Sequence, residues 1–328
     1  MTKDQPKKAQ VVCCGNIAFD LIFNDKKSNN LSFSVKPGGS VLNTAILVSR
    51  LGLSVSLIAK TGNDFLGQKL LSLLKTENIK TDNVLLDSRL KTGLALAHLN
   101  KKGDSSYIFY KSHGKLTSFG KHEFPQNIFK NVSVFHTASA YSYDDFTFNN
   151  SLSFMQRSKK EKVFISYDPN WRENRIANTT TARNRIKKLL PYIDLLKLSS
   201  SDAMGITEKR TLSKALNCLP KNIIVTLGEK GAFFYDGKKK LHTPMLKVKT
   251  VDTIGAGDAF TAGLIYRYCL LGKKLFWEHQ KENLQFASAA SALICRGRGA
   301  TEGLKNSRQV KRFLKTHLFS TSSLFCGK

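Results

Sequence analysis

The sequence predicts a mostly parallel, three-layer α/β/α domain with a small inserted β-sheet. Short β-branched runs alternate with amphipathic runs of helical length along nearly the whole chain, as they do in βαβ units. Two β-rich runs, at residues 92–99 and 105–111, fall outside that alternation and form a hairpin pattern around Gly103. A chain of 328 residues can bury one large core, so a single domain over residues 1–328 is predicted.

The N-terminal part of the chain combines strand patterns with two helix patterns. The first helix pattern follows a glycine pair and ends at Gly52, and the second follows a Thr-Gly-Asn-Asp turn. Strands are expected at residues 10–14, 17–23, 31–35 and 55–59, and helices at 44–51 and from the turn to residue 75. The strands at 17–23 and 31–35 would join the hairpin in the small sheet.

The second half of the chain continues the alternation. Strands are expected at residues 132–137, 163–167, 194–198, 222–226 and 232–235. Helices are expected at 144–160, from about residue 199, at 259–271 and at 283–296. An apolar and β-branched segment, 246–251, leads into a glycine-rich stretch.

The composition is that of a globular protein. Hydrophobic residues make up 41% of the chain and charged residues 23%. No apolar run reaches the roughly 18 residues of a membrane span, and the polar start of the chain lacks the apolar part of a secretory signal. The six cysteines show no Cys-x-x-Cys pair and no metal-ligand spacing. Reduced thiols, a cytoplasmic location and no membrane partner are therefore expected.

The charge balance is strongly basic. The chain has 52 Lys and Arg against 24 Asp and Glu, a formal net charge of +28. This balance raises nucleic-acid binding as a hypothesis. The basic pairs are spread along the chain, however, and no zinc-finger, helix-turn-helix or RRM signature accompanies them. A solvated basic surface that attracts polyanionic nucleotide is favoured, and no specific nucleic-acid partner is expected.

Residues 251–263, V-D-T-I-G-A-G-D-A-F-T-A-G, carry the clearest functional pattern. Gly255, Ala256 and Gly257 leave little side-chain bulk before a helix pattern, so backbone N–H groups can face a bound phosphate. Asp258 stands at the entrance of that helix. It is interpreted either as an N-cap or as a general base that takes a proton from an attacking hydroxyl.

The pattern from Asp252 to Asp258, D-T-x-G-A-G-D, resembles the signature of the PfkB/ribokinase family of sugar and nucleoside kinases. In that family the second Asp is the catalytic base and the Gly-Ala-Gly amides form the anion hole, which assigns these roles to Asp258 and to Gly255, Ala256 and Gly257. The resemblance covers about residues 10–315. It implies transfer of the γ-phosphoryl group of ATP to a primary hydroxyl of a small sugar, with Mg²⁺ as the cofactor.

The family resemblance also implies a lid and a sugar site. The lid would comprise about residues 16–37 and 92–113 and would carry a homodimer contact. Gly38, Gly39 and Asn43 resemble the first family motif, which contacts the sugar, although the pattern alone is also that of a helix-entry turn. Asp20, a carboxylate among apolar neighbours, would need a partner such as sugar hydroxyls, with a turn or capping role as the alternative.

The segment D-P-N-W-R ends at Arg172 and follows a predicted strand, where α/β sheets bind ligands. It resembles the fructokinase and 2-keto-3-deoxygluconate kinase branches, which favours fructose as the acceptor; a turn with a surface arginine is the alternative. The nearby segment from Lys111 to Lys115 departs from the family pattern. The acceptor therefore stays open among fructose, 2-keto-3-deoxygluconate, ribose and a nucleoside, and Lys111 or Lys115 could serve a sugar acid.

The family resemblance places the nucleotide and the ions in the second half of the chain. The implied nucleotide contacts are Ser199, Thr226, Gly228, Gly231, Gly257 and Ser288. Asp202 would organise Mg²⁺ through water, although the family's Asn-x-x-Glu is altered here and a helix-capping pair is the alternative. Asp252 and the backbone of residues 297–299 correspond to a K⁺ site in some members. A non-catalytic sugar- or nucleotide-binding regulator is the alternative from another class, which the intact Gly-Ala-Gly-Asp opposes.

Overall fold

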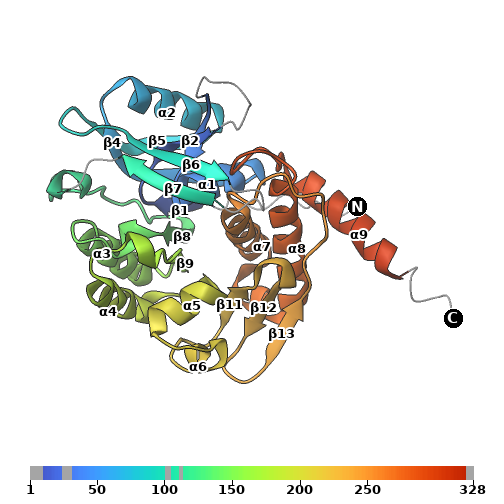
Figure 1. Ribbon diagram of the computed structural model, residues 1–328. Coiled ribbons are helices and arrows are strands. Elements are labelled where there is room, and N and C mark those ends of the chain that lie inside the picture. The colour runs from blue at the N-terminus through green and yellow to red at the C-terminus, as the bar shows by residue number, and fades with distance from the viewer. Residues whose placement is uncertain (1–9, 24–31, 100–104, 111–113, 323–328) are drawn as a thin grey trace.

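The main body is a twisted sheet between two layers of helices (Figure 1). The computed structural model describes residues 10–23, 32–99, 105–110 and 114–322. Within these ranges the main sheet has nine strands in the order β13-β12-β11-β10-β9-β8-β1-β4-β5. Neighbouring strands are parallel except in the pairs β11–β12 and β12–β13. The predicted mostly parallel three-layer fold is confirmed.

The elements of the main body follow the predicted alternation. Its strands are β1 (Gln10–Cys14), β4 (Ser54–Gly62), β5 (Ile79–Asp87), β8 (Val132–Ala138), β9 (Phe164–Asp168), β10 (Leu195–Ser199), β11 (Ile223–Thr226), β12 (Ala232–Tyr235) and β13 (Lys240–Thr243). Its helices are α1 (Ser40–Arg50), α2 (Phe65–Thr76), α3 (Phe148–Lys160), α4 (Thr179–Leu189), α5 (Ser200–Thr207), α6 (Leu212–Leu216), α7 (Ala256–Glu278), α8 (Gln280–Ile294) and α9 (Ser307–Ser322).

Several boundaries differ from the sequence prediction, and two of them have a clear local cause. Helix α1 begins at Ser40, directly after Gly39, because Val41 and Leu42 already face the core. Helix α3 begins only at Phe148, since the Asp144 carboxylate accepts from the Phe146 N–H in a local turn. The edge strand β13, which the sequence analysis did not predict, pairs with β12 as a hairpin and precedes the apolar segment at residues 246–251.

Side chains on successive residues of β1 enter different cores. Val11 and Cys13 belong to the core formed with α1, α7 and α8, whereas Val12 and Cys14 belong to the core formed with α3, α4 and α5. Successive side chains of a strand point to opposite faces of its sheet. A sheet covered on both faces therefore requires the continuous apolar runs that the sequence shows.

The small sheet lies over one end of the main body and has the strand order β3-β2-β6-β7 (Figure 1). Its strands are β2 (Ala18–Phe23), β3 (Phe33–Gly38), β6 (Gly93–Leu99) and β7 (Ser105–Tyr110). On its inner side Ile22 and Ala97 pack against Ile254 and Ala300. The predicted small sheet is thus present, and it covers the loop that leads into α7.

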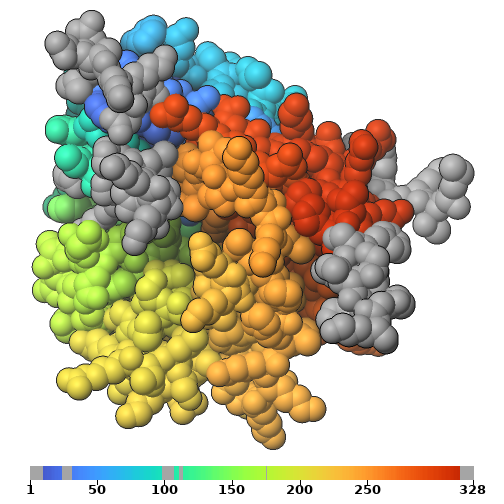
Figure 2. Space-filling model, turned by 45° about the vertical axis from the view of Figure 1, so that its right-hand side comes forward, coloured from blue at the N-terminus to red at the C-terminus, as the bar shows by residue number. Residues whose placement is uncertain are grey.

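The C-terminal third of the chain packs against the N-terminal third (Figure 2). The Arg50 guanidinium donates to the Leu304 carbonyl oxygen at 3.1 Å, and Lys36 pairs with Glu302 at 2.7 Å. Helix α1 also packs along α7. These contacts bring the two glycine-rich motifs of the sequence together. None of the helices in the described ranges is both long and apolar enough to cross a membrane.

Candidate active site

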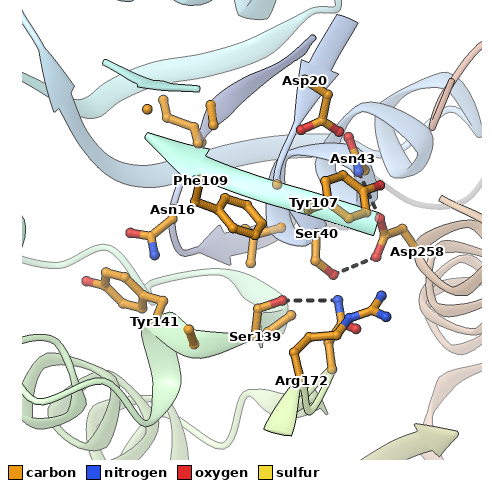
Figure 3. A pocket seen from close by; sticks show the side chains of 18 of the residues that line it. Asn16, Asp20, Ser40, Asn43, Tyr107, Phe109, Ser139, Tyr141, Arg172 and Asp258 are labelled. Carbon is orange, nitrogen blue, oxygen red and sulfur yellow. Dashed lines mark hydrogen bonds between the residues drawn. The ribbon is translucent and has the colours of Figure 1, made fainter. Parts of the chain in front are cut away.

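A cavity of about 470 Å³ lies where the small sheet, α1, α7 and the carboxyl ends of β8 and β9 meet (Figure 3). Open α/β sheets bind their ligands at this edge. Predicted sugar-site residues from three separate parts of the sequence line the cavity, namely Asp20, Gly39, Asn43 and Arg172. Tyr107 and Phe109 of β7 close it on the side of the small sheet.

Asp258 lies in this cavity as the third residue of α7. The N-cap of the helix is Gly255, so the interpretation of Asp258 as an N-cap is wrong. Its Oδ1 accepts a hydrogen bond from the Ser40 hydroxyl at 2.5 Å, and its Oδ2 accepts from Nδ2 of Asn43 at 2.9 Å. Burial raises the pKa of the Asp258 carboxyl to about 6, while these two hydrogen bonds act to lower it.

The glycine-rich turn before Asp258 places backbone N–H groups at the cavity. Gly255 has φ 78°, and a Cβ there would lie 2.4 Å from the Ala300 carbonyl oxygen, so the turn requires glycine. Gly255 and Gly257 line the cavity, at the positive end of the α7 dipole. Ala256 is not among the lining residues, and its N–H donates to the Thr253 carbonyl oxygen at 3.2 Å. The turn itself uses this amide, which weakens the predicted anion-hole role of Ala256.

Asp20 is 5% exposed and lies against the glycine pair that precedes α1. A Cβ at Gly38 would lie 2.1 Å from Oδ1 of Asp20, so the carboxylate occupies the space that the glycine leaves. Burial, together with the negative charges of Asp258 and Asp252, raises the pKa of Asp20 to about 7. Asn43 is also buried, and its Oδ1 has no hydrogen-bond partner among the described residues. Both groups therefore face the cavity with hydrogen-bonding capacity that a polyhydroxyl ligand could use.

We expect Asp20→Asn to stabilise the fold and to do so mainly at alkaline pH. A carboxyl whose folded-state pKa is raised from 3.8 to about 7 opposes folding once it ionises, so its cost grows between these values and is complete above pH 7. The free energy of unfolding should rise by about 2–4 kcal/mol at pH 8 and by less at pH 5. Urea unfolding of both proteins at the two pH values measures this; an equal change at both would contradict it.

Lys197 is a buried cation that the sequence analysis did not select. It is 5% exposed, and its Nζ lies 2.8 Å from Oδ2 of Asp168. A Cβ at Gly257 would lie 3.0 Å from Nζ, and Lys197 lines the cavity, so the ammonium lies beside the glycine turn. Burial acts to lower the pKa of Lys197, but the surrounding carboxylates, first Asp168, raise it overall. The sequence did contain a sign of this site: a lysine inside an otherwise apolar strand is expected to be buried, and a buried lysine requires a charged partner.

Arg172 lines the cavity on the side opposite Asp20 in the view of Figure 3. The two residues before it anchor the turn: Trp171 is buried in the core, and Nδ2 of Asn170 donates to Oγ of Ser139 at 3.3 Å. The arginine therefore enters the cavity directly after an anchored segment.

The residues predicted to contact the nucleotide lie mostly outside this cavity. Ser199, Thr226, Gly228, Gly231 and Ser288 are not among its lining residues, whereas Gly257 is. Ser199 and Thr226 are register neighbours at the ends of β10 and β11, and Gly228 and Gly231 are in the turn that follows β11. A Cβ at Gly231 would lie 2.1 Å from the Thr243 carbonyl oxygen, so packing alone requires that glycine. Ser288 is buried within α8.

The two acidic residues predicted to serve ions both make structural hydrogen bonds. Asp202 and Ser199 form a capping box at α5: Oδ2 of Asp202 accepts from the Ser199 N–H, and Oγ of Ser199 accepts from the Asp202 N–H, each at 3.0 Å. The capping alternative is confirmed. Asp252 is fully buried, and its carboxylate accepts at 2.8 Å from the N–H groups of Ile254 and Gly299, which ties two loops together.

A divalent cation would depend on nucleotide oxygens for its ligands. Among the described residues, no group of three or more His, Cys, Asp or Glu side chains is placed to hold a metal ion. Mg²⁺ commonly takes one or two carboxylates together with phosphate oxygens and water. The carboxylates at this edge of the sheet could supply one or two ligands to a Mg²⁺ ion that phosphate oxygens also hold. They do not form a metal site without the nucleotide.

The fold and the cavity define a class of protein. A buried carboxylate beside glycine N–H groups, at a helix N-terminus and at the carboxyl edge of a parallel sheet, can hold a hydroxyl group of one ligand next to a phosphate of another. Residues 8–307 match the family described as pfkB family carbohydrate kinase. The chain belongs to this family and is an ATP-dependent sugar kinase.

Individual relatives agree with this assignment. The chain is 30% identical over 322 residues to the probable chloroplastic fructokinase-6 of Arabidopsis thaliana, which covers 93% of this chain and 82% of the relative. The fold resembles the fructokinase of Vibrio cholerae O395 with bound fructose, ADP and calcium ion, at a TM-score of 0.82 and 22% identity over 94% and 99% of the two chains. It also resembles the ATP-bound fructokinase of Xylella fastidiosa, at a TM-score of 0.84 and 23% identity over the same shares.

Proposed function

We propose that the chain phosphorylates fructose on a primary hydroxyl and that Asp258 is the general base of this transfer. The observation that carries the proposal is the meeting of Asp258, the glycine turn and the sugar-site residues in one cavity. The similarity to curated and structurally characterised fructokinases supports fructose as the acceptor. Asp258 removes the proton of the hydroxyl while the N–H groups of Gly255 and Gly257 stabilise charge on the transferred phosphoryl group.

The surroundings of Asp258 suit a base at neutral pH. A carboxyl with a pKa of about 6 is largely ionised at pH 7 and is more basic than an ordinary aspartate. The hydrogen bond from Asn43 orients the carboxylate, and Lys197 supplies positive charge beside the turn. Mg²⁺, bound through nucleotide oxygens and water with Asp202 nearby, would neutralise charge on the phosphates.

We expect Arg172→Ala to raise the KM for fructose by about 10–100-fold, with a smaller effect on the KM for ATP. The guanidinium is the cation that the β9 turn presents to the sugar side of the cavity, and a hydrogen bond from a charged group contributes about 1.5–3 kcal/mol. Initial rates with each substrate varied in turn measure the effect. Arg185→Ala is the matched control, because Arg185 pairs with Asp145 and does not line the cavity. Equal changes for both substrates would contradict a sugar-specific role.

A panel of acceptors tests the proposed substrate. Fructose, ribose, 2-keto-3-deoxygluconate and adenosine are compared by kcat/KM with ATP as the donor, and fructose is expected to give the highest value. Lys115, one of the two cations considered for a sugar acid, does not line the cavity, and Lys111 lies outside the described residues. ATP consumption without any phosphorylated acceptor, together with salt-sensitive DNA binding, would instead favour a regulator that uses the +28 surface.

Further properties belong to the same proposal. The small sheet acts as the lid, because Tyr107 and Phe109 of β7 line the cavity. Its outer side supports a homodimer contact, since Val35 and Ile108 are 55% and 63% exposed.

A K⁺ ion near Asp252 would help to balance the negative charge of this buried carboxylate, which already accepts hydrogen bonds from two backbone N–H groups. We place the enzyme in the cytoplasm with no nucleic-acid partner.

A further inference from the structure

The Ser40 hydroxyl is hydrogen-bonded to Asp258, a contact that phosphoryl transfer to a sugar does not require. It is the first residue of α1 and lines the cavity near Gly255 and Gly257. Its hydroxyl donates to Oδ1 of Asp258 at 2.5 Å, and the other oxygen of that carboxylate accepts from Nδ2 of Asn43 at 2.9 Å. A hydroxyl, a carboxylate and a group that orients the carboxylate are thus joined by hydrogen bonds. This is the arrangement of a serine activated as a nucleophile.

We propose that Ser40 is a site at which this kinase phosphorylates itself when no sugar is bound. Asp258 takes the proton of the Ser40 hydroxyl, and Oγ attacks the γ-phosphorus of bound ATP. The bond from Oγ to phosphorus forms, the bond from phosphorus to the β,γ-bridging oxygen breaks, and ADP leaves with that oxygen. The proton passes from Asp258 to solvent, so the products are phosphoserine and ADP. The inference rests on the proposed function, because it uses the same base and the same donor.

The position of Ser40 suits the phosphorylated product. Phosphate is stabilised at a helix N-terminus by the unpaired N–H groups and the helix dipole. The N-cap of α1 is Gly39, which makes no side-chain hydrogen bond to the first turn and leaves those N–H groups to the phosphate. Lys197 adds positive charge beside Gly257, in the lining of the same cavity. Asp258 holds the transferred proton while the phosphate forms and opposes the phosphate once that proton has passed to solvent, so the N–H groups and Lys197 offset this repulsion in the product.

Sugar and self-phosphorylation are expected to exclude one another. The acceptor hydroxyl of a sugar must approach Asp258, to which the Ser40 hydroxyl donates its hydrogen bond. A sugar therefore displaces Ser40 from the base, and a phosphate on Ser40 fills space that the sugar needs. ATP without sugar should slowly convert the enzyme into a form that no longer phosphorylates sugar, and fructose should protect it.

The test is incubation of the full chain with ATP and Mg²⁺, with and without saturating fructose. The mass of the intact chain reports the phosphate incorporated, and fragmentation of its peptides locates it. Without fructose we expect up to one phosphate per chain, on Ser40, and a proportional loss of fructose phosphorylation. With fructose we expect incorporation to fall at least tenfold.

Variants separate the site from its surroundings. Ser40→Ala should incorporate no phosphate, and Asp258→Asn should do so at least about 100-fold more slowly than wild type. Ser49→Ala is the matched control, because Ser49 is on the same helix but donates to the Glu77 carbonyl oxygen at 2.6 Å. It should incorporate phosphate as the wild type does.

The possible outcomes distinguish this inference from the function on which it rests. A preparation that phosphorylates fructose but carries no phosphate on Ser40 after prolonged incubation overturns the inference and leaves the proposed function intact. Equal labelling of Ser40→Ala and wild type overturns it as well. Labelling of Ser40 without phosphorylation of fructose rejects fructose as the acceptor and supports the inference. A chain that modifies neither rejects both.

Discussion

Replacing Asp258 by Asn is expected to lower kcat by about 10²–10⁴-fold, the usual contribution of a positioned general base. An amide cannot take the proton of the acceptor hydroxyl, yet it can still accept the hydrogen bond from Ser40 and it preserves the shape of the cavity. Fructose and ATP binding should therefore change little, as calorimetric titration of both ligands would show. A variant with near-normal turnover would dismiss the assignment.

The pH dependence gives an independent measure of the same base. Because burial raises the pKa of Asp258 to about 6, the carboxyl becomes protonated and inactive below that value. The kcat/KM of the wild type should accordingly fall as the pH decreases through about 6. The residual activity of Asp258→Asn should lack this limb, and an unchanged limb would assign it to another group.

Replacing Lys197 by Met should lower both the stability and the activity of the enzyme. The change leaves the Asp168 carboxylate buried and without its ammonium partner at 2.8 Å, and breaking a buried ion pair on one side costs about 3–5 kcal/mol. It also removes a positive charge that lies beside Gly257 and lowers the pKa of Asp258. Urea unfolding and steady-state rates measure the two effects.

A double variant separates the charge of Lys197 from its packing. Lys197→Met with Asp168→Asn removes both charges, so the double variant should be more stable than Lys197→Met alone. The Lys197 ammonium lowers the pKa of Asp258. In Lys197→Met that pKa should therefore be higher, and the acidic fall of kcat/KM should move to higher pH. Two results would contradict this role of the buried pair. One is an unchanged pH for the acidic fall of kcat/KM in Lys197→Met; the other is a Lys197→Met or Asp168→Asn variant that is as stable as wild type.

Local pattern in the sequence was sufficient for the architecture and for the main site motifs. Alternating β-branched and amphipathic runs predicted the parallel sheet, because a strand buried on both faces must be apolar throughout. Gly39 and Gly255 marked two sharp turns, since their positive φ angles and close backbone contacts exclude side chains. Asp20 was found as a carboxylate among apolar neighbours, Asn43 and Arg172 through segments that resemble family motifs, and all three line one cavity.

Only the tertiary structure decided which groups surround Asp258. Its partner Ser40 is 218 residues away in the sequence, and the ammonium of Lys197 pairs with a carboxylate 29 residues away. The use of the Ala256 N–H within its own turn was equally invisible to the pattern. Sequence spacing encodes the conformation of neighbouring residues, whereas the partner and the pKa of a buried carboxylate depend on which distant elements the fold brings within hydrogen-bonding distance.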